Sequence, residues 1–140
     1  MAKHRKEPTE TAEQLPRTLV IGVYTPGLQH EASHYFEEFS RLVETAGIDP
    51  TQTLYLKLRS IDNAFFFTKG KLQEIQEFCD KNDIEHVVVS SLLSAMQERN
   101  LEDVLNCKVY GRAELILNIF QQAAHSAEGR VQVEMAILAH

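Results

Sequence analysis

The amino-acid sequence predicts an α/β fold: a small parallel β-sheet flanked by helices in the order β-α-β-α-β-α-β, followed by a C-terminal helical hairpin. Residues 18–24 form a nearly continuous apolar run, which is typical of a strand buried on both faces of a parallel sheet. Strand-like and helix-like segments then alternate as far as residue 110. Such alternation favours a parallel sheet with helices on both faces and right-handed crossover connections.

Two different periodicities predict the first helix and the second strand. From about Glu31 apolar residues recur at helical spacing, and Gly47 closes the pattern, as glycine commonly does at a helix end. The apolar positions of this helix are Tyr35, Phe36, Phe39, Leu42, Val43 and Ala46. Residues 51–59 alternate polar and apolar side chains, which predicts a half-buried strand. After a break at residues 60–63, the segment Ala64–Phe67 could form a short additional strand.

The remaining elements continue the same alternation. Residues 68–71 lead into a helix, and residues 83–90 are predicted to be the next strand. The inner face of that helix consists of Leu72, Ile75, Phe78 and Cys79. Ser94 and Gln97 have the spacing of a capping box, so a further helix is expected to run to about Asn106. Residues 107–110 are predicted to be the last short strand.

Three parts are expected along the chain: a disordered leader over residues 1–16, an α/β subdomain over residues 17–110 and a helical hairpin over residues 111–140. In the last part, two helical patterns flank a short polar loop that contains Gly129. No Gly, Asn or Pro follows the second pattern to end it. We therefore expect a hairpin truncated in its second helix, within a longer protein.

Composition and charge narrow the classes of function. A formal net charge of −6 argues against bulk affinity for nucleic acid, although a local basic edge remains compatible with it. No stretch approaches the roughly 18 consecutive apolar residues of a membrane helix, and the first residues lack the apolar core of a secretory signal. Cys79 and Cys107 lie in apolar contexts, so we expect buried thiols in a reducing cytosol rather than a disulfide or a metal pair.

The strand-to-helix turn formed by Thr68, Lys69, Gly70 and Lys71 is a candidate phosphate- or nucleotide-binding site. Backbone N–H groups at the start of a helix attract anions, and the two lysines would add positive charge. The turn lacks the Walker A spacing. The alternative interpretation, in which the glycine provides backbone freedom and the lysines are solvated, is therefore favoured.

The region around this turn has a local excess of positive charge. Between residues 51 and 71 the charged side chains are Lys57, Arg59, Lys69 and Lys71 against Asp62. Such an excess could form a docking edge for a phosphate backbone. A solvated strand end explains it equally well.

No catalytic residue and no metal site are predicted. His30 and His34 have the i, i+4 spacing that can place two imidazoles on one helical face, but no third ligand is visible in the sequence. The sequence contains no pattern that places a nucleophile beside a base, and no glycine-rich dinucleotide motif.

The C-terminal part carries a resemblance to a known family. It contains Glu114–Phe120 (Glu-Leu-Ile-Leu-Asn-Ile-Phe), then Glu128-Gly129-Arg130 and Gln132-Val133-Glu134. This run closely resembles the N-terminal domain of the HflX GTPases. Two upstream segments also resemble that family: residues 67–74 (Phe-Thr-Lys-Gly-Lys-Leu-Gln-Glu) and residues 99–105 (Arg-Asn-Leu-Glu-Asp-Val-Leu). The resemblance covers the chain from about Arg17 to its end.

The resemblance implies a function that composition and spacing do not show. HflX proteins are cytoplasmic, ribosome-associated GTPases that bind the large (50S) subunit and split stalled ribosomes, notably in the heat-stress response. Their N-terminal domain, an α/β subdomain followed by a helical hairpin, takes part in ribosome binding. ATP binding is also attributed to it. The GTPase domain, which binds GTP and Mg²⁺, lies downstream of the segment that this chain resembles, so no GTP hydrolysis is expected from the chain alone.

The implied contact with 23S rRNA is the hairpin loop, formed by His125, Ser126, Glu128, Gly129 and Arg130. Three hypotheses follow. The chain docks a GTPase on the ribosome; or it is a nucleotide-binding α/β domain that uses the turn at residues 68–71; or it is a module that regulates the downstream GTPase domain. The family often has Arg where this chain has Ala123, His125 and Ala127, so this loop is less basic than usual.

Overall fold

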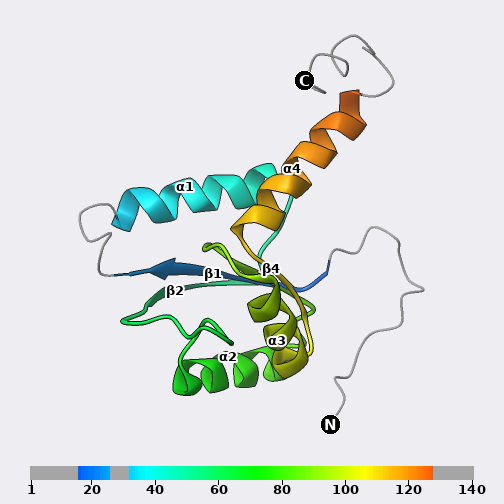
Figure 1. Cartoon of the computed structure of the whole chain (residues 1–140). Helices are drawn as coiled ribbons and strands as arrows, with labels where there is room; N and C mark the ends of the chain where they lie inside the picture. Colours follow the sequence, from blue (N-terminus) through cyan, green and yellow to red (C-terminus); the bar gives the residue numbers. More distant parts are fainter. Residues whose placement is uncertain (1–15, 26–31, 128–140) are drawn as a thin grey trace.

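The computed structural model describes residues 16–25 and 32–127. Within these residues a four-stranded parallel sheet alternates with helices, as predicted (Figure 1). The elements are β1 (Thr18–Tyr24), α1 (Ala32–Thr45), β2 (Gln52–Lys57), α2 (Lys69–Lys81), β3 (His86–Val89), α3 (Ala95–Leu105), β4 (Lys108–Tyr110) and α4 (Arg112–Ala127). The fold class predicted from the sequence is confirmed.

The sheet has the strand order β2-β1-β3-β4, and every neighbouring pair is parallel. The apolar strand β1 lies inside the sheet, and all seven of its residues are buried. The alternating strand β2 lies at an edge, where it shows the half-buried pattern that its sequence predicts. Leu19 lies opposite Gln52 on one side and Val87 on the other, which fixes the register of the two central pairings.

Two layers of helices cover the sheet: α1 and α4 on one face, α2 and α3 on the other (Figure 1). Successive strand residues point to opposite faces of the sheet, so a strand can contribute side chains to the core under each helix layer. In β1, Leu19, Ile21 and Val23 join the core beneath α2 and α3, whereas Val20 joins the core beneath α1 and α4. The α1–α4 core is the smaller one, and its buried members are Val20, Phe39, Val43, Ala46, Val88 and Leu115.

The helix ends confirm two local predictions. The Gln97 N–H donates to the Ser94 Oγ (3.0 Å), and the Ser94 N–H donates to the Gln97 Oε1 (2.9 Å), which completes the capping box of α3. After α1, Gly47 has a φ of +78°, a left-handed conformation that glycine adopts at low cost.

The additional strand suggested for Ala64–Phe67 does not form. Only an isolated bridge between Asp62 and Phe66 is present, and Phe66 has a φ of +67°. The reason is the Asp62 side chain, whose Oδ2 accepts hydrogen bonds from the backbone N–H groups of Ala64 (2.9 Å) and Phe65 (2.7 Å). Because these N–H groups are bonded to a nearby side chain and not to a neighbouring strand, the segment forms a turn.

The helix α4 is longer than predicted. It continues through Ala127, so His125 and Ser126 belong to its last turn rather than to a loop. Alanines at 123, 124 and 127 favour helix, and no glycine or proline interrupts the sequence before Gly129. The predicted leader up to Leu15 and the predicted second helix of the hairpin lie outside the described residues.

Candidate functional site

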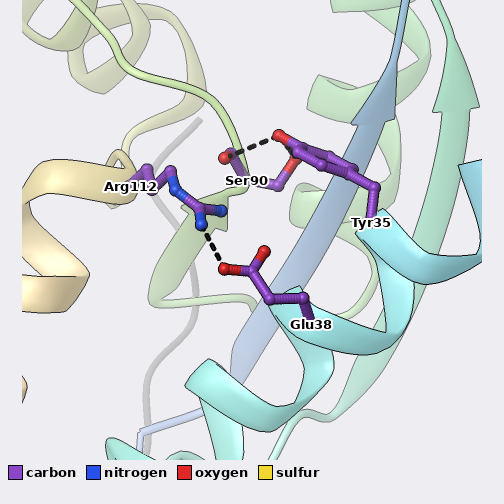
Figure 2. Close-up of polar contacts among 4 residues, drawn as sticks. All are labelled: Tyr35, Glu38, Ser90 and Arg112. Carbon is purple, nitrogen blue, oxygen red and sulfur yellow. Dashed lines mark hydrogen bonds and ion pairs between the residues drawn. The ribbon is translucent and has the colours of Figure 1, made fainter. Parts of the chain in front are cut away.

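The carboxyl ends of the strands form the edge where a doubly wound sheet usually holds its functional groups. The strand order reverses between β1 and β3, because the chain leaves β1 for the α1 face and leaves β3 for the α3 face. Tyr35, Glu38, Ser90 and Arg112 come together near this point from α1, the end of β3 and the start of α4 (Figure 2).

Ser90 follows β3 and is completely buried. Its Oγ accepts a hydrogen bond from the Val23 N–H (2.8 Å), and its carbonyl oxygen accepts one from the Tyr35 hydroxyl (3.1 Å). Its own N–H donates to the Ile21 carbonyl (2.9 Å). These bonds connect the end of β3 with β1 and α1, which is a structural role.

Arg112, the first residue of α4, joins α4 to α1. Its Nη2 forms an ion pair with the Glu38 Oε2 (2.5 Å), and its guanidinium lies over the Tyr35 ring at 5.9 Å (Figure 2). Its Nη1 is buried and has no hydrogen-bond partner among the described residues. A guanidinium held by a carboxylate and an aromatic ring fixes the base of the helix.

Two carboxyl groups meet where α4 leaves the sheet. Burial, together with a hydrogen bond to Glu114 and the charges of Glu114 and Glu102, raises the pKa of Glu98 to about 7. Burial acts to raise the pKa of Glu114 as well, but hydrogen bonds from Glu98 and from backbone N–H groups, including that of Gly111 (3.0 Å), lower it overall. Below pH 7 a proton shared by the pair therefore resides mainly on Glu98, while Glu114 stays charged and accepts a hydrogen bond from the Gly111 N–H at the start of α4.

The predicted phosphate-binding turn is an exposed helix start. Thr68 is the N-cap of α2, but its side chain makes no capping hydrogen bond. Lys71 pairs with Glu74 (3.4 Å), and no described atom lies within 4 Å of where a Cβ on Gly70 would be. The turn therefore offers uncapped backbone N–H groups, but packing does not require its glycine. Its nucleotide-binding role stays a prediction.

A cavity of about 180 Å³ lies on the α1–α4 face. It is lined by Pro16, Thr18, Gly47, Ile48, Asp49, His86, Val88, Tyr110, Glu114, Leu115 and Asn118. The rings of His86 and Tyr110 meet edge to face, with centroids 5.4 Å apart. Two carboxylates and no lysine or arginine occur among these lining residues, so the cavity disfavours the phosphates of a nucleotide.

Three further expectations concern metal, thiols and membrane. No group of three or more His, Cys, Asp or Glu side chains that could hold a metal ion occurs within residues 16–25 and 32–127, and His30 lies outside them. Cys79 and Cys107 are both buried thiols, as predicted, and the Cys107 Sγ donates to the Ile84 carbonyl (3.1 Å). Across the same residues, no helix has the length and apolar character needed to span a bilayer.

The outer face of α4 is an apolar stripe that the other described residues leave uncovered. Ala113, Leu117, Phe120 and Ala124 follow one another at intervals of four, three and four residues, the spacing of a coiled-coil seam. Leu117 and Phe120 are 56% and 64% exposed. The predicted loop residues follow this stripe: His125 and Ser126 lie in the last turn of α4, and Glu128, Gly129 and Arg130 lie outside the described residues.

Sequence reasoning missed the cluster around Ser90 and Arg112. Its contacts join residues that are 55 and 74 positions apart in the chain, which no local pattern reveals. The available signal was positional, since Ser90 ends the predicted strand over residues 83–90 and Arg112 comes shortly after the predicted strand over residues 107–110.

Comparisons with known proteins agree on one family. The family model described as "GTP-binding GTPase N-terminal" matches residues 33–121. The chain is 34% identical to GTPase HflX of Caldanaerobacter subterraneus subsp. tengcongensis over 92% of its length, and 38% identical to GTPase HflX of Escherichia coli K12 over 74%. It spans only 29% and 24% of those two relatives.

Solved structures match the fold of the chain as well. A GDP complex of the GTP-binding protein SsGBP has a TM-score of 0.60 at 28% identity, covering 88% of this chain and 34% of that one. A GTP-binding protein from Sulfolobus solfataricus, also with GDP, has a TM-score of 0.56 at 25% identity, covering 74% of this chain and 30% of that one.

Proposed function

The chain belongs to the HflX family of GTPases, as an N-terminal domain, and from this premise we propose that it docks such a GTPase on the large ribosomal subunit. In this proposal the contact is made with 23S rRNA. Docking in the cytoplasm helps the parent protein, by which we mean the full-length GTPase that contains this domain, to dissociate stalled ribosomes under stress. GTP and Mg²⁺ bind in the GTPase domain, which the family carries downstream.

The observation that carries the proposal is the apolar stripe on the outer face of α4, which is uncovered within residues 16–25 and 32–127. A helix with an apolar seam on its solvent side needs a second helix to bury that seam. Val131, Met135 and Leu138 repeat the same intervals of four and three residues. Folded back on α4, they would place Val131 near Ala127 and Leu138 near Phe120, and the two helices would form the predicted hairpin.

The attachment of α4 would make this hairpin a firm projection. At its base Arg112 is held by Glu38, and further along the Gln122 Nε2 donates to the Ala46 carbonyl (2.9 Å). The 16 residues of α4 extend about 24 Å, and its last turns project from the body of the domain (Figure 1). A loop at the tip could enter a crevice of rRNA while the base stays fixed on the α/β subdomain.

The charge of residues 125–130, which we call the tip of the hairpin, sets the strength of the expected contact with rRNA. Arg130 and His125 can approach phosphates, while Glu128 opposes them. Phosphate contacts supply much of the affinity for nucleic acid and weaken with salt. We therefore expect ribosome binding to be sensitive to salt and to depend on these few positions.

Co-sedimentation of the parent protein with 50S subunits tests the proposal. Arg130→Glu combined with His125→Glu should weaken binding at least about tenfold, a loss of about 1.4 kcal/mol. The matched control is Lys81→Glu with Gln73→Glu, which makes the same charge change on the exposed surface of α2. Full binding by the tip variant, or equal weakening by the control, would contradict the assignment of the tip.

A second candidate function is ATP binding at Thr68, Lys69, Gly70 and Lys71. The uncapped N–H groups at the start of α2 favour it, because they lie at the carboxyl edge and are available to an anion. ATP at about 100 times Kd should stabilise the protein by about 2.7 kcal/mol, and Lys69→Glu should remove the effect. A melting temperature that does not change at millimolar ATP rejects this candidate.

A further inference from the structure

Three apolar side chains are exposed at the carboxyl edge of the sheet. Leu92 is 68% exposed, and Ile61 and Met96 are each 45% exposed. Ile61 lies in the connection between β2 and α2, Leu92 in the connection between β3 and α3, and Met96 in the first turn of α3. We call these three residues the edge patch.

Hydrogen bonds hold the segments of the edge patch together. The Gln97 Nε2, next to Met96, donates to the carbonyl of Asp62, next to Ile61 (2.9 Å). The Asn100 Nδ2 donates to the Ala64 carbonyl (2.9 Å), and the capping box fixes the first turn of α3. The three side chains are therefore presented on fixed backbone, and their exposure does not result from a loose connection.

The edge patch lies beside the base of α4. The Arg112 N–H donates to the Ser91 carbonyl (3.0 Å), one residue before Leu92. At Gly111 a Cβ would lie only 3.1 Å from the Leu93 Cγ and 3.2 Å from the Ser91 carbonyl oxygen, so the close approach requires glycine. The connection between β3 and α3 and the start of α4 thus form one continuous surface.

The path of the chain indicates what covers this surface. In the proposed hairpin, α4 leads about 24 Å away from the carboxyl edge, and a second helix of similar length would lead back to it. The chain that follows would emerge next to Arg112 and the edge patch. The relatives are more than three times as long as the matched segment, and the matching family model is described as N-terminal, so most of their length is expected to follow this segment.

We propose that the edge patch is the docking surface of the GTPase domain that follows the hairpin, which would bury Ile61, Leu92 and Met96 against apolar side chains of its own. This inference rests on the proposed function, because it requires the hairpin and the downstream domain. It assigns the contact that the third hypothesis requires, between this domain and the downstream GTPase domain, to a specific face. Apolar side chains presented in this way are typical of the centre of a protein–protein interface rather than of an rRNA contact.

Thiol labelling of the full-length parent protein tests the proposal. Leu92→Cys and Met96→Cys should react with a maleimide at least about tenfold more slowly than Glu77→Cys, an exposed control on α2, each rate normalised to that of the denatured protein. Cys79 and Cys107 are buried, so peptide mapping should assign the label to the new thiols. Equal rates at all three positions would overturn the proposal.

A photo-crosslinker attached at Leu92→Cys identifies the occupant. Crosslinks to a peptide of the downstream domain within one polypeptide support the proposal. Crosslinks between two polypeptides, or protection that disappears on dilution, indicate a second copy and overturn it. Co-sedimentation of the tip variants tests the ribosome-docking proposal separately, because these variants leave the edge patch intact. Either proposal can therefore fail without the other.

Discussion

The two faces of α4 have similar composition but different surroundings. On the inner face, Leu115 is buried with Val88 and Phe39 in the core beneath α1 and α4, and Ile119 packs against that core. On the outer face, Leu117 and Phe120 are mostly exposed and have no layer over them in the part of the chain that the structure describes. A helix that is apolar on both sides is normally buried on both sides.

This difference shows which residues of α4 stabilise the domain by packing in its core and which remain exposed on its surface. The inner residues already stabilise the described fold, since each buried Leu or Ile side chain contributes about 1.5–3 kcal/mol relative to exposure. The outer residues contribute little to that fold. Their burial would stabilise the protein only when a second helix covers them, as it would in the proposed hairpin.

The largest expected effect follows from truncating the inner face. Leu115→Ala should destabilise the domain by about 2–5 kcal/mol, because the side chain leaves a cavity in the small α1–α4 core. In a variant that ends at Ala127, where no second helix can cover the outer face, Leu117→Ala is the matched control and should cost much less. Urea denaturation measures both free energies of unfolding. Equal losses would show that the two faces do not differ.

A smaller effect is expected at the base of α4. Arg112→Met keeps the apolar stem over Tyr35 but removes the ion pair with Glu38, which is half exposed, so the expected cost is about 1 kcal/mol. Lys71→Met removes the exposed pair with Glu74 on α2 and should cost less than about 0.5 kcal/mol. Loss of stability in the second variant but not in the first would contradict the role given to Arg112.

The pH dependence of stability tests the junction between α3 and α4. The pKa of Glu98 is raised from 4.5 to about 7, so the folded state binds the proton more tightly than the unfolded state. Its stabilising contribution is therefore complete below pH 4.5 and is lost as pH rises towards and through 7. The lowered pKa of Glu114 acts in the opposite direction and only at lower pH.

The variant Glu98→Gln keeps the hydrogen-bonding group and cannot lose a proton. Relative to wild type, it should become more stable as pH is raised from 5 to 8, which thermal melts at both values can measure. A difference in melting temperature that does not depend on pH would show that the two carboxyl groups do not share a proton.

Local patterns predicted the elements but not the contacts that connect them. The strand at Thr18, the helix end at Gly47 and the capping box at Ser94 each depend on a few neighbouring residues, and all three are confirmed. The Arg112–Glu38 and Ser90–Val23 contacts depend on topology, so they could not be read from spacing. The three consecutive phenylalanines at residues 65–67 suggested a strand. The segment forms a turn instead, because the Asp62 side chain accepts hydrogen bonds from its backbone N–H groups.

The distance between residues 120 and 138 tests the central claim most directly. Spin labels at Phe120→Cys and Leu138→Cys in the parent protein report it by electron paramagnetic resonance. If the outer face of α4 is covered by a second helix, the helix axes lie about 8–10 Å apart and the labels should be within about 20 Å. A straight continuation of α4 would separate the two backbone positions by about 27 Å and would contradict the hairpin.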